Sequence, residues 1–238
     1  MVTEQLDIVA RYGVSKGWRL KRRTVLVEGT SDVSLINVAA RLFKAKTDQL
    51  ILQDLAIVAA GEGDRGGTRG VIRELITLRN LSEAYLSPAG RPVYRFMGLF
   101  DDDTPGRNAV TGARNIDTSI TEYRDILRLR PVMPATGSLD PSTMKRSFDA
   151  LNAAHKGINW ELEDLIGEDL LALFLEDYPT ALIRSASVGG AVHRELTQDG
   201  KRNLIRYCDK NADLASLMPV VNLIHALRHY LNLSQIPN

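Results

Sequence analysis

Three consecutive aspartates, Asp101, Asp102 and Asp103, form the most unusual group of acidic side chains in this sequence. Adjacent carboxylates repel one another, so a folded chain tolerates them best where a positive charge neutralises them. They follow the apolar run 93–100, which predicts a buried strand, and Gly106 comes shortly after them. Open α/β sheets bind their ligands beyond the carboxyl ends of the strands. The triplet therefore predicts a site for a hard divalent cation, with Mg²⁺ as the best match to carboxylate oxygens.

A further acid, Glu28, is expected to lie beside this triplet although it is distant in the sequence. It directly follows a β-branched run that predicts another strand, and the carboxyl ends of parallel strands share one edge of a sheet. Side chains alternate along extended backbone, so Asp101 and Asp103 should point to one side and Asp102 away from it, as a bystander. Asp32 lies one helical turn beyond Glu28 and either joins the same site or caps a helix.

The apolar pattern around these acids alternates between strands and helices. Strands are predicted at 24–27, 55–60 and 93–100 and within 125–132, and helices at 3–12, 33–43, 68–81 and from Gly106 onward. Ser31 or Asp32 is the expected N-cap of the second helix, and a glycine-rich loop, 61–67, precedes the third. Strands that alternate with helices of this length predict an α/β fold with a mostly parallel sheet flanked by helices.

The second part of the chain has a different pattern. From about residue 134 no strand-like run is recognised, and helices are predicted at 141–154, 159–178, 201–209 and 213–231. Pro219 should kink the last of these helices or split it in two. We therefore expect residues 1–133 to form an N-terminal helix and the α/β core, and residues 134–238 to form a helical C-terminal extension packed on that core.

The bulk composition is typical of a soluble globular protein. The chain has 238 residues, 44% of them hydrophobic and 25% charged, and its formal net charge of +1 produces no global basic field. The single cysteine, Cys208, excludes an internal disulfide and suits a reducing compartment. No stretch approaches the roughly 20 apolar residues that span a bilayer. These features predict a cytoplasmic protein without a membrane partner, and we interpret His225 and His229 as structural.

Two short motifs together resemble the Toprim domain of topoisomerases, bacterial primases and a group of nucleases. Residues 27–32, Val-Glu-Gly-Thr-Ser-Asp, match that family's strand followed by Glu-Gly, and residues 101–106, Asp-Asp-Asp-Thr-Pro-Gly, match its Asp-x-Asp-x-x-Gly. Each motif alone is weak, but both follow predicted strands in the order that the family has. The resemblance covers about residues 20–130 and implies a Toprim-like, Rossmann-like sheet with a Mg²⁺ site.

Within this family, the form Glu-Gly-x-Ser-Asp resembles the nuclease branch, which includes the overcoming-lysogenization-defect (OLD) family and related phage-defence proteins. In that branch an acidic Glu-Leu-Glu segment supplies a second metal site, and a later lysine assists catalysis. Glu161-Leu162-Glu163 resembles the first feature, and Lys201 resembles the second. The chain departs from the branch because it has no Walker motif. An ATPase, if one is needed, must come from a separate chain.

The resemblance implies a nuclease that cleaves DNA or RNA with two Mg²⁺ or Mn²⁺ ions. The implied ligands are Glu28, Asp101 and Asp103 for one ion, and Asp32 with Glu161 or Glu163 for the other. Lys201 would stabilise charge in the transition state. The residues expected to contact phosphates are Arg22, Arg23, Arg65 and Arg107. We also expect the protein to act as an antiphage effector controlled by a separate ATPase or sensor. It is further expected to form a homodimer.

Other interpretations of the same residues stay open at this point. A primase-like nucleotidyl transferase would use the same metal site, and a regulatory or binding module would keep the acids without catalysis. The aspartate triplet can also be a helix cap followed by turn acids, and the acidic block 161–164 can be a solvated helix face. The basic run 16–23 can be a solvated patch. The sequence does not separate DNA from RNA as the substrate.

Overall fold

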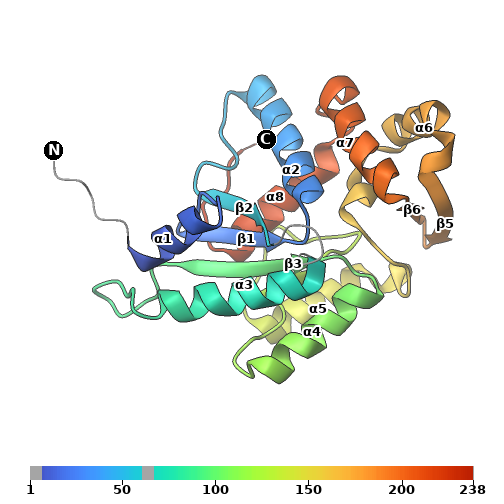
Figure 1. Cartoon of the computed structure of the whole chain (residues 1–238). Coiled ribbons are helices and arrows are strands. Elements are labelled where there is room, and N and C mark those ends of the chain that lie inside the picture. The colour runs from blue at the N-terminus through green and yellow to red at the C-terminus, as the bar shows by residue number, and fades with distance from the viewer. Residues whose placement is uncertain (1–6, 61–66, 238) are drawn as a thin grey trace.

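The computed structural model of the protein describes residues 7–60 and 67–237 and has a four-stranded sheet at its centre (Figure 1). The strands are β1 (Arg23–Val27), β2 (Leu55–Ala59), β3 (Arg95–Phe100) and β4 (Ile126–Arg128). All neighbouring strands are parallel, in the order β2-β1-β3-β4. Helices cover both faces of this sheet. The expected α/β class, a parallel sheet flanked by helices, is therefore confirmed.

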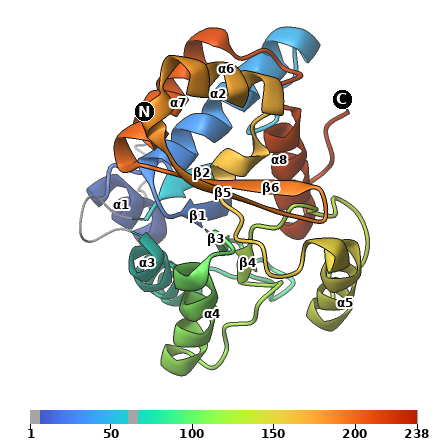
Figure 2. The same cartoon turned by 90° about the vertical axis from the view of Figure 1, so that its right-hand side faces the viewer.

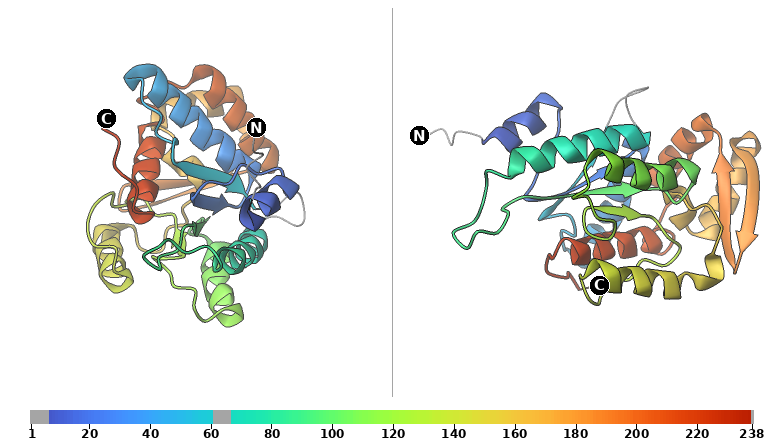
Figure 3. Two further views of the ribbon diagram at one scale, coloured as in Figure 1. Left: turned by 90° about the vertical axis from the view of Figure 1, so that its left-hand side faces the viewer. Right: turned by 90° about the horizontal axis from the view of Figure 1, so that it is seen from below.

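The helices of the first half connect the strands and cover the sheet on both sides. They are α1 (Ile8–Ser15), α2 (Thr30–Thr47), α3 (Gly67–Ser82) and α4 (Thr104–Ile116). In Figure 1, α2 lies above the sheet, and α3 and α4 lie below it; Figure 3 shows the same separation. In β1, Val25 and Val27 enter the core on one face and Leu26 enters the core on the other. Because both faces are covered, the strands are mostly apolar, and their arginines lie at strand ends.

The strand order places a topological switch point between β1 and β3. From β1 the chain passes through α2 to β2 on one side, and then through α3 to β3 on the other side of β1. Connections that diverge in this way leave a crevice beyond the carboxyl ends of the two strands, where α/β proteins bind their ligands. Glu28 follows β1 and Asp101 follows β3, so these two acids border the crevice.

Three helices of the first half have other ends than expected, and one of them, α2, extends beyond the predicted 33–43 at both ends. α1 continues to Ser15 instead of ending at residue 12, and positions 3–6 of the predicted helix lie outside the described residues. α4 begins at Thr104 rather than at Gly106, because Asp103 acts as its N-cap. The last acid of the triplet therefore starts the next helix.

The C-terminal half contains a β-hairpin that the sequence analysis did not predict. β5 (Leu182–Val188) and β6 (Ala191–Leu196) pair in antiparallel fashion, so the expectation of an all-helical extension is wrong. The hairpin lies at one end of the molecule, far from α1 (Figures 1 and 3). Both turn residues, Gly189 and Gly190, have positive φ, as two-residue hairpin turns require. The middle of β5 is exposed and therefore lacks the apolar run by which strands are recognised.

The helices of the second half are α5 (Pro141–Leu151), α6 (Glu168–Asp177), α7 (Gln198–Asn211) and α8 (Met218–Tyr230). Three of them are shorter than predicted and one of these is divided, whereas α7 extends beyond the predicted 201–209 at both ends. The helix expected over 159–178 is a 3₁₀ turn, Leu162–Leu165, followed by α6. Pro219 neither kinks nor splits α8, because it lies in the first turn, where a missing N–H costs no helical bond. Side chains from these helices and from β1 and α2 share one hydrophobic core.

None of the helices in the described part of the chain has the length and the apolar character that crossing a membrane requires.

Gly106 is needed because α4 approaches the end of β3 closely. A Cβ at this position would lie 1.9 Å from the backbone oxygen of Asp101. We expect Gly106→Ala to lower the free energy of unfolding by about 2–4 kcal/mol, because the helix must move away from the strand end. Gly112 lies in the same helix with nothing within 4 Å of an added Cβ. Gly112→Ala should therefore be neutral or stabilise by up to about 1 kcal/mol. Urea unfolding of both variants measures the difference, and equal stabilities would contradict the close approach.

Candidate active site

Glu28 and Asp101 meet at the carboxyl edge of the parallel sheet although 73 positions separate them. The backbone N–H of Asp101 donates to Oε1 of Glu28 at 3.4 Å. β1 and β3 are direct neighbours, with Leu26 opposite Gly98, so the two strands end at the same level. The strands run toward the C-terminal elements, which close the open side of the edge (Figure 1).

Asp32 and Asp103 are held by backbone N–H groups at the N-termini of two helices. Oδ1 of Asp103 accepts a bond of 2.7 Å from the first turn of α4. The N-cap of α2 is Gly29, not Ser31 or Asp32 as expected; Asp32 is the third helical residue, and its Oδ2 accepts the Gly29 N–H at 2.9 Å. The charge of Asp32 still acts on Glu28. Asp32 thus combines the two roles that the sequence left open, a helix cap and a member of the acidic group.

The segment before α6 brings two more acids to this edge. Asp102 and Trp160 exchange two backbone hydrogen bonds, of 2.9 and 3.3 Å, which fasten the segment alongside the end of β3. Glu161 follows immediately, and Glu163 lies in the 3₁₀ turn, where it is 4% exposed. The charges of both glutamates act on the carboxylate of Asp101. The acidic block is therefore part of the site rather than a solvated helix face.

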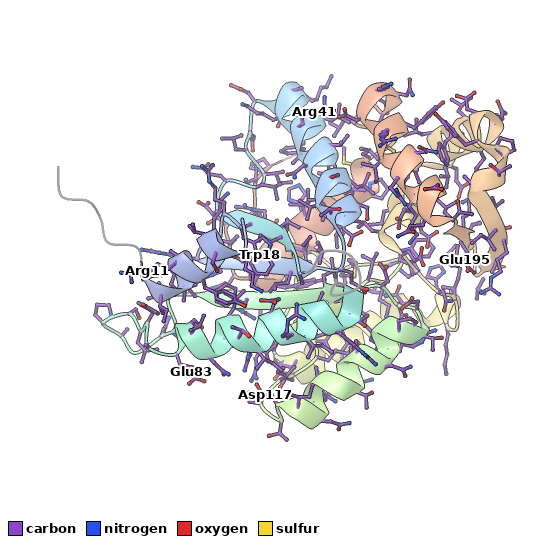
Figure 4. The ribbon with its side chains drawn as sticks, viewed as in Figure 1. Arg11, Trp18, Arg41, Glu83, Asp117 and Glu195 are labelled. Carbon is purple, nitrogen blue, oxygen red and sulfur yellow. The ribbon has the colours of Figure 1, made fainter. Side chains whose placement is uncertain are left out.

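Lys201, from α7, contributes a positive charge to this group of acids. Its Nζ lies 2.7 Å from Oε2 of Glu161 and 3.5 Å from Oε1 of Glu163. Burial acts to lower the pKa of this ammonium, but the charges of the two glutamates outweigh it and raise the pKa well above its ordinary value. α7 is held against α2, where Arg41 pairs with Asp209 at 2.7 Å (Arg41 is labelled in Figure 4). In the metal-free protein Lys201 is therefore a cation and not a base.

These seven side chains form one group, which we call the acidic centre. Its members are Glu28, Asp32, Asp101, Asp103, Glu161, Glu163 and Lys201. Burial, reinforced by neighbouring carboxylates, raises the pKa of Glu28 to about 7 and that of Glu163 to about 7. The same causes raise the pKa of Asp101 well above its ordinary value. Six carboxylates share one ammonium, so the centre can accommodate further positive charge.

His193, which the sequence analysis did not single out, holds the acid-bearing turn in place. Its Nδ1 lies 2.7 Å from Oδ2 of Asp164, and its side chain is 8% exposed. Asp164 also accepts the backbone N–H groups of Glu161, at 2.8 Å, and of Arg194, at 3.0 Å. The hydrogen bond with Asp164 raises the pKa of His193. His193 is a positioning residue, and it was missed because the hairpin that carries it was not recognised.

The arginines expected to contact phosphates lie in different parts of the molecule. Arg22 and Arg23 precede or begin β1, so Arg23 lies about 16 Å along the strand from Glu28. Both line a separate hollow at the amino end of the sheet, and their position does not support contact with a substrate at the acidic centre. Arg65 lies outside the described residues. Arg107, in the first turn of α4, does lie beside the aspartate triplet.

Asp102 lies apart from the acidic centre, as a bystander of the predicted metal site would, but it has a structural role of its own. It is 3% exposed, and its carboxylate is paired with Arg107, Arg128 and Arg130. A buried carboxylate requires such partners, because burial without them would be strongly unfavourable. Asp102 thus separates the acidic centre from a group of arginines.

The chemistry of the acidic centre fits a hard divalent cation. Carboxylate oxygens are the ligands that Mg²⁺ and Mn²⁺ prefer, and Oδ2 of Asp103 makes no hydrogen bond with a described residue. Within residues 7–60 and 67–237, no three Asp, Glu, His or Cys side chains are close enough together to form a ready-made metal site. The composition of the centre, rather than a preformed cage, is therefore what favours a metal.

Comparisons with protein-family models, with curated proteins and with solved structures find no match for this chain. Its class follows from the fold and the site instead. It is an α/β protein with an all-parallel sheet, whose topological switch point carries six carboxylates and one lysine.

Proposed function

We propose that this protein is a Toprim-type, Mg²⁺-dependent nuclease that cleaves phosphodiester bonds of DNA or RNA. The observation that carries the proposal is the acidic centre at the topological switch point. Two motif acids, Glu28 and Asp101, are in hydrogen-bond contact there, and a distant acidic segment and Lys201 join them. An effector role in antiphage defence, under a separate ATPase or sensor, is the biological setting that the motif resemblance favours.

We assign the carboxylates of the centre to two ions. Glu28, Asp101 and Asp103 would hold one ion, and Asp32 with Glu161 or Glu163 would hold the second. When bound, such ions neutralise the charge that develops on the phosphate in the transition state and activate the attacking water. Lys201 keeps its proton because its pKa is raised, so its ammonium stabilises negative charge without proton transfer.

Removal of the Lys201 ammonium should slow cleavage strongly. We expect Lys201→Ala to lower kcat by about 10²–10³-fold, the usual effect of losing one group that stabilises transition-state charge. Lys201→Arg should recover part of this loss because it keeps the positive charge. Lys210→Ala is the matched control, since Lys210 is an exposed lysine near the end of the same helix. Initial rates at saturating Mg²⁺ measure the effect, and an unchanged kcat in Lys201→Ala would exclude the assigned role.

The proposed function is tested by incubating the protein with supercoiled plasmid, single-stranded DNA and structured RNA, each in Mg²⁺, Mn²⁺ or EDTA. We expect cleavage of at least one polymer with either ion and no cleavage in EDTA. Incorporation of nucleoside triphosphates on a single-stranded template would instead identify a primase-like transferase. Absence of any reaction with all three polymers would contradict the proposal and favour a binding module.

A further inference from the structure

Asp102 organises a second group of charged side chains next to the acidic centre. Its Oδ1 accepts from Nη1 of Arg107 at 3.3 Å and from Nη1 of Arg128 at 3.0 Å, and its Oδ2 accepts from Nη1 of Arg130. Arg128 also pairs with Glu122 at 2.7 Å. Three guanidinium groups thus meet two carboxylates, and the group keeps an excess of positive charge.

These arginines line a hollow of about 650 Å³, which we call the arginine pocket. Its lining comes from β4, α4, α5 and the segment after α5, and Figure 2 shows β4 between the two helices. Lys156, on the rim, is exposed and makes no ion pair with a described residue. Nε and Nη2 of Arg130 make no hydrogen bond with a described residue either. The pocket therefore offers free donors in addition to its excess charge.

The basic surface continues beyond the arginine pocket along α4. A neighbouring hollow of about 350 Å³ shares Arg107 and Arg128 with it and adds Arg114. Arg114 is exposed and makes no ion pair with a described residue. The acid on the rim of the arginine pocket, Asp149, is already paired with Lys145. Glu122, which lines the second hollow, is paired with Arg128, so a ligand lying across both hollows would meet an excess of positive charge.

We propose that the arginine pocket binds a phosphate group of the nucleic-acid strand whose cleaved bond lies at the acidic centre. This inference rests on the proposed function. The guanidinium fork matches phosphate oxygens, and the buried Asp102 holds three such forks in place, so little ordering is needed when the ligand binds. Asp101 and Asp103 flank Asp102, so the pocket and the centre are neighbours, and a strand carries phosphates for both.

The electrostatics of the metal-free acidic centre favour such a pocket. Its carboxylates outnumber its one ammonium, and the net charge of the whole chain is only +1, so without bound cations no general attraction draws a polyanion to the centre. A local group of cations beside the centre supplies the attraction where the strand must lie. Affinity for the strand should therefore depend on these few residues and on the salt concentration.

Strand binding can be measured without cleavage. Fluorescence anisotropy of a labelled single-stranded oligonucleotide, titrated with the full-length protein in EDTA, gives Kd as a function of salt. We expect Arg130→Ala to weaken binding by about 10-fold and Lys156→Ala by about 3-fold. In each variant the slope of log Kd against log salt concentration should decrease by about 1, the value for one lost phosphate contact. Asp149→Asn should strengthen binding about 2-fold by removing a rim acid. Lys46→Ala, an exposed lysine on α2 on the other face of the sheet, should leave Kd unchanged.

The outcomes separate the pocket from the proposed function. Lys156 is exposed, so Lys156→Ala should fold normally even if loss of Arg130 disturbs Asp102. Unchanged Kd and salt dependence in both variants would overturn the arginine pocket even if the wild-type protein cleaves. Oligonucleotides with and without a 5′-phosphate distinguish the source of the phosphate. If the variants bind both probes more weakly, the pocket binds an internal phosphodiester. If they bind only the phosphorylated probe more weakly, it binds the phosphate at the strand end. Either result supports the pocket.

Discussion

Asp101→Asn is expected to abolish metal-dependent cleavage, by at least about 10³-fold, while the fold is kept. The amide has the volume of the carboxylate, so packing at the end of β3 is preserved, but it lacks the charge that a cation requires. The pKa of Asp101 is raised well above its ordinary value, because burial and the charges of Asp32 and Glu163 disfavour its ionised form. The metal-free variant should therefore be more stable than the wild type near pH 8.

Cleavage assays and thermal unfolding of the same preparations test both parts of this prediction. Asp177→Asn is the matched control, because Asp177 is an exposed acid at the end of α6, away from the centre. It should cleave at the wild-type rate and show no gain in stability. Wild-type cleavage by Asp101→Asn would exclude Asp101 as a ligand. A loss of both activity and stability would show that the variant acts through misfolding.

The stability of the metal-free protein is expected to fall as the pH rises from about 4.5 to about 7. The pKa values of Glu28 and Glu163 are about 7 in the folded chain, whereas an unfolded glutamate has about 4.5. The folded state therefore binds more protons in this range, and each group contributes a loss of about 3 kcal/mol by the upper end of it. The pKa of His193 is also raised, so its contribution to the stability of the folded protein is likewise lost as the pH rises.

Divalent cations should reverse this loss, because they bind the ionised carboxylates in competition with protons. We expect Mg²⁺ or Mn²⁺ to raise Tm by several degrees near pH 8 and by much less near pH 5. Glu163→Gln should flatten the pH dependence, since it removes one of the titrating groups. Glu83→Gln, at an exposed position (Figure 4), is the control. Thermal scans in EDTA and in excess metal measure these effects, and equal metal shifts at both pH values would contradict a carboxylate site.

Much of the α/β core could be predicted because its signals are local. β1 and β3 are apolar over the three and five residues, respectively, that lead to their carboxyl ends, as strands covered on both faces tend to be, and the acids that follow them mark those ends. The hairpin β5–β6 escaped prediction because β5 is exposed in its middle. Its paired glycines, Gly189 and Gly190, were the available signal. The observed start of α4 differs from the predicted one because the capping residue, Asp103, determines where this helix begins.

The acids of the candidate site were predictable to the extent that they follow strands. Glu28 and Asp101 could be paired because parallel strands end at one edge. The role of Asp102 could not be predicted from the sequence. Its partners Arg128 and Arg130 are ordinary charged residues there, and they meet Asp102 only because β3 pairs with β4. An ion pair over such a distance has no local pattern.

The sequence by itself determined the sheet and the kind of chemistry at its edge, because apolar periodicity and the position of acids after strands are properties of neighbouring residues. Only the tertiary structure decided which charges share a site. It brings Lys201 to Glu161 and Glu163, and it surrounds Asp102 with arginines. These contacts depend on how the C-terminal elements and β4 pack against the sheet, and packing joins residues that no spacing along the chain relates.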